Sequence, residues 1–214
     1  IRVVYCYPEH VTGRLLDVIS NQEKIVKYLD LPIQHVSKKV LKAMNRPGDY
    51  QSLKHRIQQI RAAVPGIVLR TTVMTGFPGE GEKEFDELCR FINETRFERL
   101  GCFAFSPEEG TPAAVMPNQV EDSVKQRRRE IVMQEQSRIS DWYNNEQIGR
   151  TLNILVEGYD RYADCWFGRS EADAPEIDGK VFFRCAPGKV KPGDMTCVLI
   201  TSTIDWDLMG ECCE

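Results

Sequence analysis

The chain has 214 residues, of which 42% are hydrophobic and 28% charged, and its formal net charge is −4. It has no run of about 18 apolar residues, which excludes a transmembrane helix, and its N-terminus resembles neither a signal nor a transit peptide. The eight cysteines follow no short, regular spacing and include no Cys-x2-Cys pair. These features argue against a secreted disulfide framework and a zinc ribbon, and they predict a cytoplasmic protein with reduced thiols and no membrane partner.

The first 110 residues alternate between strand-like and helix-like segments. The strand-like runs cover residues 3–7, 28–34, 68–75 and 100–105, and the helix-like segments cover residues 12–20, 37–44, 49–63 and 82–94. In the third helix Leu53, Ile57, Ile60 and Val64 are spaced three and four residues apart, which places them on one apolar face. Because each helix returns the chain across the sheet, the strands are predicted to be parallel.

The carboxyl ends of parallel strands are where ligands bind in such folds. Here those ends are residues 7–8, 34–35, 76–80 and 106–110, and all four are expected on one side of the sheet. Four strand–helix units cannot close an eight-stranded barrel, so the sheet is open or incomplete. The predicted fold class of this part is therefore α/β, with a parallel sheet. The chain also starts within a strand-like run and without Met, which indicates a fragment.

Residues 120–147 are predicted to form one long helix. Its basic run, residues 125–129, could bind nucleic acid, but Glu121, Asp122 and Glu130 flank it, which favours a solvated helix face. After Gly149, short strand-like runs at residues 151–156, 165–168, 180–184 and 195–201 are separated by Gly, Pro and Asp turns. This texture is typical of a small all-β barrel. We therefore divide the chain into domains 1–146 and 147–214.

Charge is distributed unevenly between the two parts. Residues 1–150 contain 22 Lys and Arg against 20 Asp and Glu, a net of +2, whereas residues 151–214 contain 6 against 12, a net of −6; the two sum to −4. RNA binding draws on Lys and Arg to neutralise phosphate. An acidic terminal domain suits a basic protein partner better than it suits RNA.

Four segments carry the candidate site, and each is weak when taken alone. Residues 75–80 (TGFPGE) place glycines between a strand and a helix, where a backbone can approach a ligand closely. Residues 31–35 (LPIQH) place two polar side chains at a strand end, although a lone His there is more often structural. Residues 41–46 (LKAMNR) and 105–111 (FSPEEGT) complete the set.

The order and distances of these four segments resemble the radical S-adenosylmethionine methylthiotransferases. In that family a partial barrel of six strand–helix units precedes a small TRAM β-barrel, and the resemblance covers essentially the whole chain. It implies an incomplete radical SAM-type barrel followed by a TRAM barrel, which would recognise the substrate.

The family has two main branches, one acting on a tRNA adenosine and one on an aspartate of ribosomal protein S-twelve. Residues 34–37 (QHVS) depart from the Gln-Ser-Gly-Ser usual in the tRNA enzymes. Residues 46–48 (RPG) and 168–179 (GRSEADAPEIDG) resemble the ribosomal-protein branch. The favoured interpretation is a fragment of a ribosomal-protein methylthiotransferase. A fragment of a tRNA methylthiotransferase and a non-catalytic binding module are the alternatives.

The resemblance implies S-adenosylmethionine as a cofactor, together with two four-iron four-sulfur clusters in the full-length enzyme. The implied cofactor-binding residues are Gln34, His35, Arg70, Thr72, Gly76, Phe77, Pro78, Gly79, Glu80 and Ser106. Thiolates hold such clusters, and no cysteine triplet here has the family's Cys-x3-Cys-x2-Cys spacing. We expect no cluster in this chain and no activity from the chain alone, and we assign no catalytic residue.

The acidic loop at residues 173–179 is the predicted contact with the substrate, with Glu171, Asp173, Glu176 and Asp178 offering exposed carboxylates. The expected partner is ribosomal protein S-twelve or the small ribosomal subunit, and tRNA is disfavoured. The strand expected at residues 3–7 would lack its neighbour in the six-unit barrel. An unpaired strand edge recruits partners, which predicts self-association.

Overall fold

The computed structural model describes residues 1–186 and 188–213. They form two compact units, residues 1–136 and 137–214, and each is described below by itself. The two compact units meet between residues 136 and 137, inside a long helix. The domain boundary at 146/147 that we inferred from the sequence therefore stays a proposal. In the part of the chain that the structure describes, no helix is long and apolar enough to cross a membrane.

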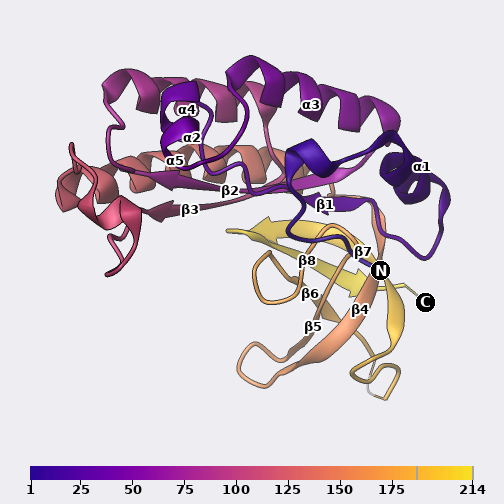
Figure 1. Cartoon of the computed structure of the whole chain (residues 1–214). Coiled ribbons are helices and arrows are strands. Elements are labelled where there is room, and N and C mark those ends of the chain that lie inside the picture. Colours follow the sequence, from indigo (N-terminus) through magenta and orange to yellow (C-terminus); the bar gives the residue numbers. More distant parts are fainter. Residues whose placement is uncertain (187, 214) are drawn as a thin grey trace. The chain divides into compact units, whose positions relative to one another are not determined.

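The first unit is built on a parallel three-stranded sheet in the order β1-β2-β3 (Figure 1). The strands are β1 (Tyr28–Asp30), β2 (Val68–Thr75) and β3 (Arg99–Ala104). The helices are α1 (Gly13–Asn21), α2 (Lys38–Ala43), α3 (Tyr50–Ala63) and α4 (Glu82–Thr95), with 3-10 turns η1 (Pro8–His10) and η2 (Pro112–Val115). Helix α5 (Asp122–Asn145) begins in this unit, and its residues after 136 belong to the second unit. Helices α3 and α4 lie on the same side of the sheet. The parallel strand–helix order is confirmed.

Strand β2 has two unlike faces. Leu69, Thr71 and Val73 are fully buried, whereas Arg70 and Thr72 are only half-buried. Side chains alternate across a strand, so the first set lies under the helices and the second on the opposite side. The apolar stripes predicted for α3 and α4 are buried as expected, comprising Leu53, Ile57, Ile60, Val64, Phe85, Leu88, Phe91 and Ile92.

Residues 3–7 do not form the predicted strand. Val3 makes a single parallel bridge to Leu29, and Tyr5 then turns to a positive φ of 56°, which interrupts extended backbone. The Asp30 carboxylate accepts a hydrogen bond from the Tyr5 N–H at 3.1 Å, which satisfies the amide that a ladder would have used. The strand prediction was wrong for this local reason, and the proposed self-association through its edge stays a prediction.

Strand β1 is shorter than predicted because Pro32 has no N–H to donate to a ladder. The Thr71 hydroxyl donates to the Leu31 carbonyl at 2.7 Å and accepts from the Ile33 N–H at 3.4 Å. It thereby bridges the gap that the proline leaves. Pairing with β2 resumes at Gln34, which forms an isolated parallel bridge with Val73.

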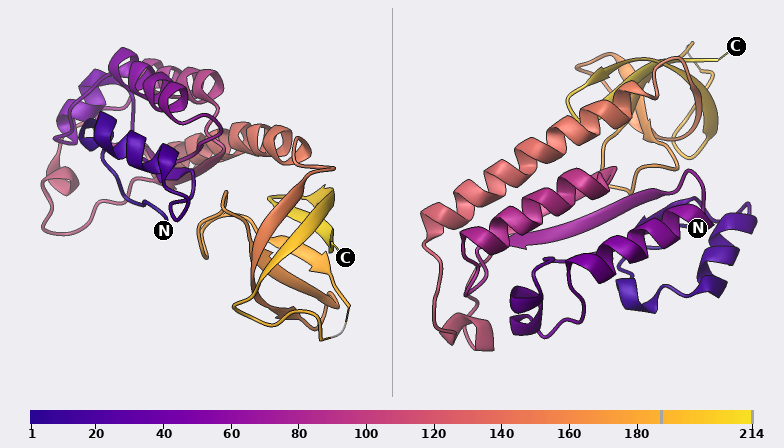
Figure 2. Two further views of the ribbon diagram at one scale, coloured as in Figure 1. Left: turned by 90° about the vertical axis from the view of Figure 1, so that its right-hand side faces the viewer. Right: turned by 90° about the horizontal axis from the view of Figure 1, so that it is seen from above.

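The second unit contains a closed barrel of five strands in the order β4-β5-β6-β8-β7 (Figure 2). The strands are β4 (Thr151–Asp160), β5 (Cys165–Arg169), β6 (Val181–Arg184), β7 (Met195–Ile204) and β8 (Asp207–Cys212). Its core consists of Ile154, Val156, Val181, Phe183, Val190, Val198, Ile200 and Leu208. Strand β8 was not predicted. In the structure buried Leu208 and Gly210 alternate with exposed Met209 and Glu211, but the residue types, with Met209 on the exposed side, do not show this alternation.

Candidate functional site

A mainly apolar groove lies at the carboxyl ends of the three parallel strands. Its volume is about 420 Å³. It is lined by Gln34, Ala43, Met44, Asn45, Arg46, Met74, Phe77, Phe105, Thr111, Pro112, Ala113 and Met116. Phe77, which follows β2, and Phe105, which follows β3, meet edge-to-face with their ring centroids 5.1 Å apart. The adjacent ends of two strands therefore supply the aromatic floor.

Gln34 enters this groove through an unusual backbone conformation. Its φ is +64°, yet its N–H donates to the Thr72 carbonyl at 2.9 Å and its carbonyl accepts from the Met74 N–H at 2.7 Å. Both main-chain bonds tie the loop to β2. A left-handed residue held in this way costs on the order of 1 kcal/mol and is common near binding sites.

The turn after β2 requires glycine at Gly76. Its φ is +74°, and a Cβ there would lie 2.2 Å from the Lys125 Cγ. The turn is closed by Glu80, whose carboxylate accepts a hydrogen bond from the Gly76 N–H at 2.9 Å. Gly79 has a φ of +85° and donates to the Asn118 carbonyl at 2.9 Å, and Pro78 between them is buried.

Behind the turn lies a buried network of charged groups. Glu80 accepts from the Arg128 guanidinium at 2.9 Å, and its second oxygen lies 3.2 Å from His35 Nε2. His35 Nδ1 accepts from the Ser37 N–H at 3.0 Å, so in a neutral ring the proton sits on Nε2, facing the carboxylate. Among the described residues, neither His35 Nε2 nor Glu80 Oε2 has another hydrogen-bond partner. These side chains hold the strand ends together and do not line the groove.

The basic run in α5 is only in part the solvated face that the sequence indicated, since Gln126, Arg127 and Arg129 are exposed. Lys125 and Arg128 are buried, and Arg128 also donates to the Glu80 carbonyl at 3.0 Å and to the exposed Glu82 at 2.6 Å. The missed signal was helical spacing: Lys125, Arg128 and Val132 lie three and four residues apart, on one face. The partner of Arg128 is 48 residues distant in the chain, which sequence periodicity does not show.

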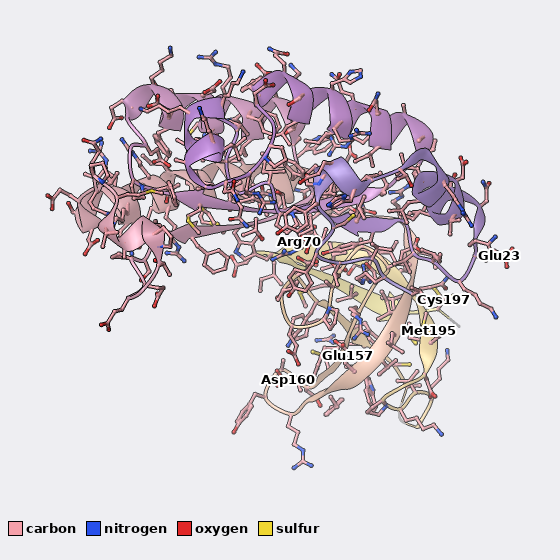
Figure 3. The ribbon with its side chains drawn as sticks, viewed as in Figure 1. Glu23, Arg70, Glu157, Asp160, Met195 and Cys197 are labelled. Carbon is pink, nitrogen blue, oxygen red and sulfur yellow. The ribbon has the colours of Figure 1, made fainter. Side chains whose placement is uncertain are left out.

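Arg70 and Thr72 lie on the sheet face opposite to the helices, as Figure 3 shows for Arg70. Arg70 pairs with Asp30 on the neighbouring strand at 3.0 Å and donates to the Thr72 hydroxyl at 3.3 Å. Both residues thus belong to a polar ladder across β1 and β2. Ser106 is exposed on the loop after Phe105 and is not among the residues that line the groove.

The predicted acidic loop of the second unit is only partly exposed. Asp173 is buried and accepts a hydrogen bond from the Ser170 hydroxyl at 2.6 Å. The half-buried Asp178 accepts from the Ala174 N–H at 2.8 Å. Expecting exposed carboxylates at all four positions was wrong, because two of them fold the loop. Glu171 and Glu176 are exposed.

A larger groove, which the sequence did not indicate, lies on the barrel itself and has a volume of about 520 Å³. Its lining comes from all five strands of the barrel, β4 to β8, and from the turns between strands. The acidic members are Asp160, Asp205, Asp207 and Glu211, and the partly exposed apolar members include Ile204 and Met209. Arg184 is the single basic residue in the lining. Burial raises the pKa of Asp207 above its usual value.

Within the part of the chain that the structure describes, no group of three or more His, Cys, Asp or Glu side chains is placed to hold a metal ion. The comparisons with known proteins agree with the two units. The radical SAM superfamily matches residues 1–92, and the TRAM domain matches residues 148–213.

Curated relatives match nearly all of this sequence. The ribosomal protein uS12 methylthiotransferase RimO of Clostridium acetobutylicum is 42% identical over 210 residues, covering 98% of this chain and 46% of its own. The RimO of Caldanaerobacter subterraneus subsp. tengcongensis is 46% identical over 211 residues, covering 99% and 48%. The chain belongs to the radical SAM methylthiotransferase family. It spans about half the length of these RimO relatives.

A solved structure supports the fold. Coproporphyrinogen III oxidase (HemN) of Escherichia coli, a radical SAM enzyme, superimposes with a TM-score of 0.51 at 13% identity, covering 80% of this chain and 46% of that one. The chain thus consists of an incomplete parallel β/α barrel of the radical SAM type, followed by a TRAM barrel. That fold class was predicted from the sequence and is confirmed.

Proposed function

We propose that this chain forms part of an enzyme that methylthiolates the β-carbon of an aspartate in ribosomal protein uS12, and that the chain alone is inactive. The observation that carries this proposal is the 42–46% identity to uS12 methylthiotransferases across 98–99% of the chain. The groove at the strand ends would hold S-adenosylmethionine, and the acidic barrel would dock uS12.

The groove of the first unit suits S-adenosylmethionine in size and chemistry. Small-molecule sites enclose about 300–1,000 Å³ and are largely apolar with a few polar groups, and this groove has about 420 Å³. Phe77 and Phe105 offer aromatic surface for an adenine ring. Gln34 and Arg46 supply polar groups at its edge. When bound, this cofactor supplies the radical chemistry of the family.

The residues of this chain hold the walls of the groove in place. Glu80 closes the turn at Gly76 and accepts from Arg128, and this anchors Phe77 between them. His35 anchors the loop that carries Gln34. We propose Gln34, Gly76, Phe77, Pro78 and Gly79 as the cofactor's contacts, with His35 and Glu80 behind them. Arg70, Thr72 and Ser106 remain proposed contacts outside the groove lining.

The iron–sulfur clusters do not fit the residues present. Cluster ligation needs converging thiolates, and no suitable group of ligands exists among the described residues. We assign no cluster ligand to this chain.

The acidic groove on the barrel is the proposed docking surface for uS12. Ribosomal proteins are generally basic, and the four carboxylates around this groove face a single arginine. Ile204 and Met209, respectively 51% and 39% exposed, offer apolar contact beside the charges. A basic segment of uS12 would pair its cations with the rim and lay aliphatic stems along the floor. Glu171 and Glu176 of the neighbouring loop are the competing contact.

The activity is tested with the complete protein that contains this chain. After anaerobic reconstitution with iron and sulfide, it is incubated with S-adenosylmethionine and uS12, with tRNA in a parallel reaction. Mass spectrometry should find a methylthio group on one uS12 aspartate and none on tRNA. Modification of tRNA would support the tRNA branch instead, and modification of neither would support a binding module.

The docking surface is tested by two pairs of substitutions that remove equal charge. Asp205→Asn with Glu211→Gln removes two of the four groove carboxylates, and Glu171→Gln with Glu176→Gln removes the two exposed carboxylates of the loop. The groove pair should weaken uS12 binding roughly tenfold and reduce its salt dependence, while the loop pair has less effect. Equal effects would mean that only net charge matters, and a larger effect of the loop pair would reject the groove.

A further inference from the structure

Two cysteines of the barrel lie side by side on neighbouring strands. Strands β6 and β8 run parallel, with Arg184 opposite Glu211, and Cys185 and Cys212 are the next residues along each. Their Sγ atoms lie 2.7 Å apart, whereas the two sulfurs of a disulfide bond lie about 2.05 Å apart. Both are free thiols in this structure. A shift of less than 1 Å would therefore bring them to bonding distance.

The surroundings of the two thiols differ. Both pack against the barrel core and are partly buried. The Thr196 Oγ1 lies 3.2 Å from the Cys212 Sγ, so its hydroxyl can donate to a thiolate there. Burial and the neighbouring Cys212 raise the pKa of Cys185 to about 11. Because the thiolate is the nucleophile and the Thr196 hydroxyl can stabilise one at Cys212, Cys212 is the better placed to react first.

We propose that Cys185 and Cys212 are a redox-active pair that forms a disulfide when a peroxide reaches the barrel. The Cys212 thiolate attacks one oxygen of hydrogen peroxide and becomes a sulfenic acid, and the other oxygen leaves as hydroxide, which takes up a proton. The Cys185 sulfur then displaces the sulfenic hydroxyl, which takes up the proton lost by Cys185 and leaves as water. The two sulfurs together lose two electrons, and the two peroxide oxygens gain them.

The bond would tie the end of β6 to the end of β8. It would close the chain segment between residues 185 and 212, which restricts the unfolded barrel. Arg184 and Glu211, which line the acidic groove, directly precede the two cysteines. Oxidation would thus stiffen one wall of that groove. This inference does not depend on which partner the groove binds.

A second pair of neighbouring cysteines in the same barrel serves as a control for this pair. Cys197 and Cys213 are also opposite each other, on β7 and at the end of β8, where the Cys213 N–H donates to the Cys197 carbonyl at 2.9 Å. Successive side chains of a strand point to opposite faces, so Cys213 does not share the side of Cys212. Cys197 is exposed. If exposure alone determined which cysteine peroxide oxidises first, Cys197 would react before the other cysteines.

The test treats the full chain with hydrogen peroxide under denaturant-free conditions, followed by alkylation and non-reducing peptide mapping. The expected product is about 2 Da lighter, through loss of two hydrogen atoms, and carries a Cys185–Cys212 cross-link. Its melting temperature should rise by roughly 5 °C or more and return after treatment with dithiothreitol. Cys197→Ser should preserve the cross-link, whereas Cys185→Ala and Cys212→Ala should abolish it.

A cross-link between Cys197 and Cys213, or sulfinic acids without any cross-link, would overturn the proposal. So would an unchanged melting temperature in a fully cross-linked sample, since the strands would then gain no restraint. If a cysteine variant fails to fold, the mapping of the wild-type chain still decides the pairing.

Discussion

His35 Nε2 and Glu80 Oε2 face each other at 3.2 Å, with both side chains fully buried. His35 stands at the end of the loop after β1, and Glu80 closes the turn after β2. Arg128 of α5 holds the other oxygen of the same carboxylate. This contact therefore links three segments that are distant in sequence, directly behind the groove.

Replacing Glu80 by Gln should destabilise the first unit by about 3 kcal/mol, because the buried Arg128 would keep only the exposed Glu82 as a charged partner. The same substitution at Glu82, the exposed second partner of Arg128, should change stability by less than about 0.5 kcal/mol. Hydrogen exchange of the β2 amides measures both. Equal protection in the two variants would contradict a structural role for the buried contact.

Gly76→Ala should be more damaging than Gly66→Ala, although both glycines have similar positive φ values of +74° and +77°. At Gly66 nothing lies within 4 Å of the added methyl, whereas at Gly76 it meets the Lys125 side chain at 2.2 Å. Backbone strain costs on the order of 1 kcal/mol at each site, and the collision adds roughly 1–3 kcal/mol at Gly76. Urea unfolding followed by circular dichroism would show the difference, and two equal losses would refute it.

Met116→Glu should weaken binding of S-adenosylmethionine by the complete enzyme at least roughly tenfold, because it places a charge in an apolar groove. Its neighbour Val115 is 84% exposed and does not line the groove, so Val115→Glu is the matched control. Equilibrium dialysis gives both affinities. Unchanged affinity in the Met116 variant would place the cofactor elsewhere.

Asp207→Asn should stabilise the barrel at neutral pH by under about 1 kcal/mol, because the carboxylate is only half-buried. Burial raises the pKa of Asp207 in the fold, so its ionised form is less favourable there than in the unfolded chain. This penalty is absent below the unfolded pKa of about 3.9 and complete once the pH exceeds the folded value. Asn keeps the acceptor for the Lys180 N–H, which lies 2.7 Å from the carboxylate.

Thermal melts across this pH range measure the prediction for Asp207. The gain from the substitution should vanish in acid and appear as the pH rises towards neutral. A gain that is the same at every pH would point to packing instead of charge, and a loss at neutral pH would contradict the sign.

Sequence periodicity was sufficient to predict the helices and strands whose buried faces are set by their own residues. The apolar stripe Leu53, Ile57, Ile60 and Val64 is buried as expected, and strand β2 has its predicted bounds. Asp49 caps α3 by accepting from the Ser52 N–H at 2.9 Å, a local interaction within four residues. Such features depend on near neighbours in the chain, so the sequence alone determines them.

Tertiary structure decided the features in which distant residues meet. The sequence predicted that Lys125 and Arg128 belong to a solvated helix face, but the fold places Glu80 against Arg128. Residues 3–7 were predicted to form a strand, but the Tyr5 N–H donates to the Asp30 carboxylate and the backbone turns at Tyr5. Asp173 was predicted to be exposed, but it is buried in its loop and accepts a hydrogen bond from the Ser170 hydroxyl. The sequence determined which residues carry charge and where the helices and the main strands run; only the fold decided which charges are buried and paired, because desolvation and pairing depend on neighbours from elsewhere in the chain.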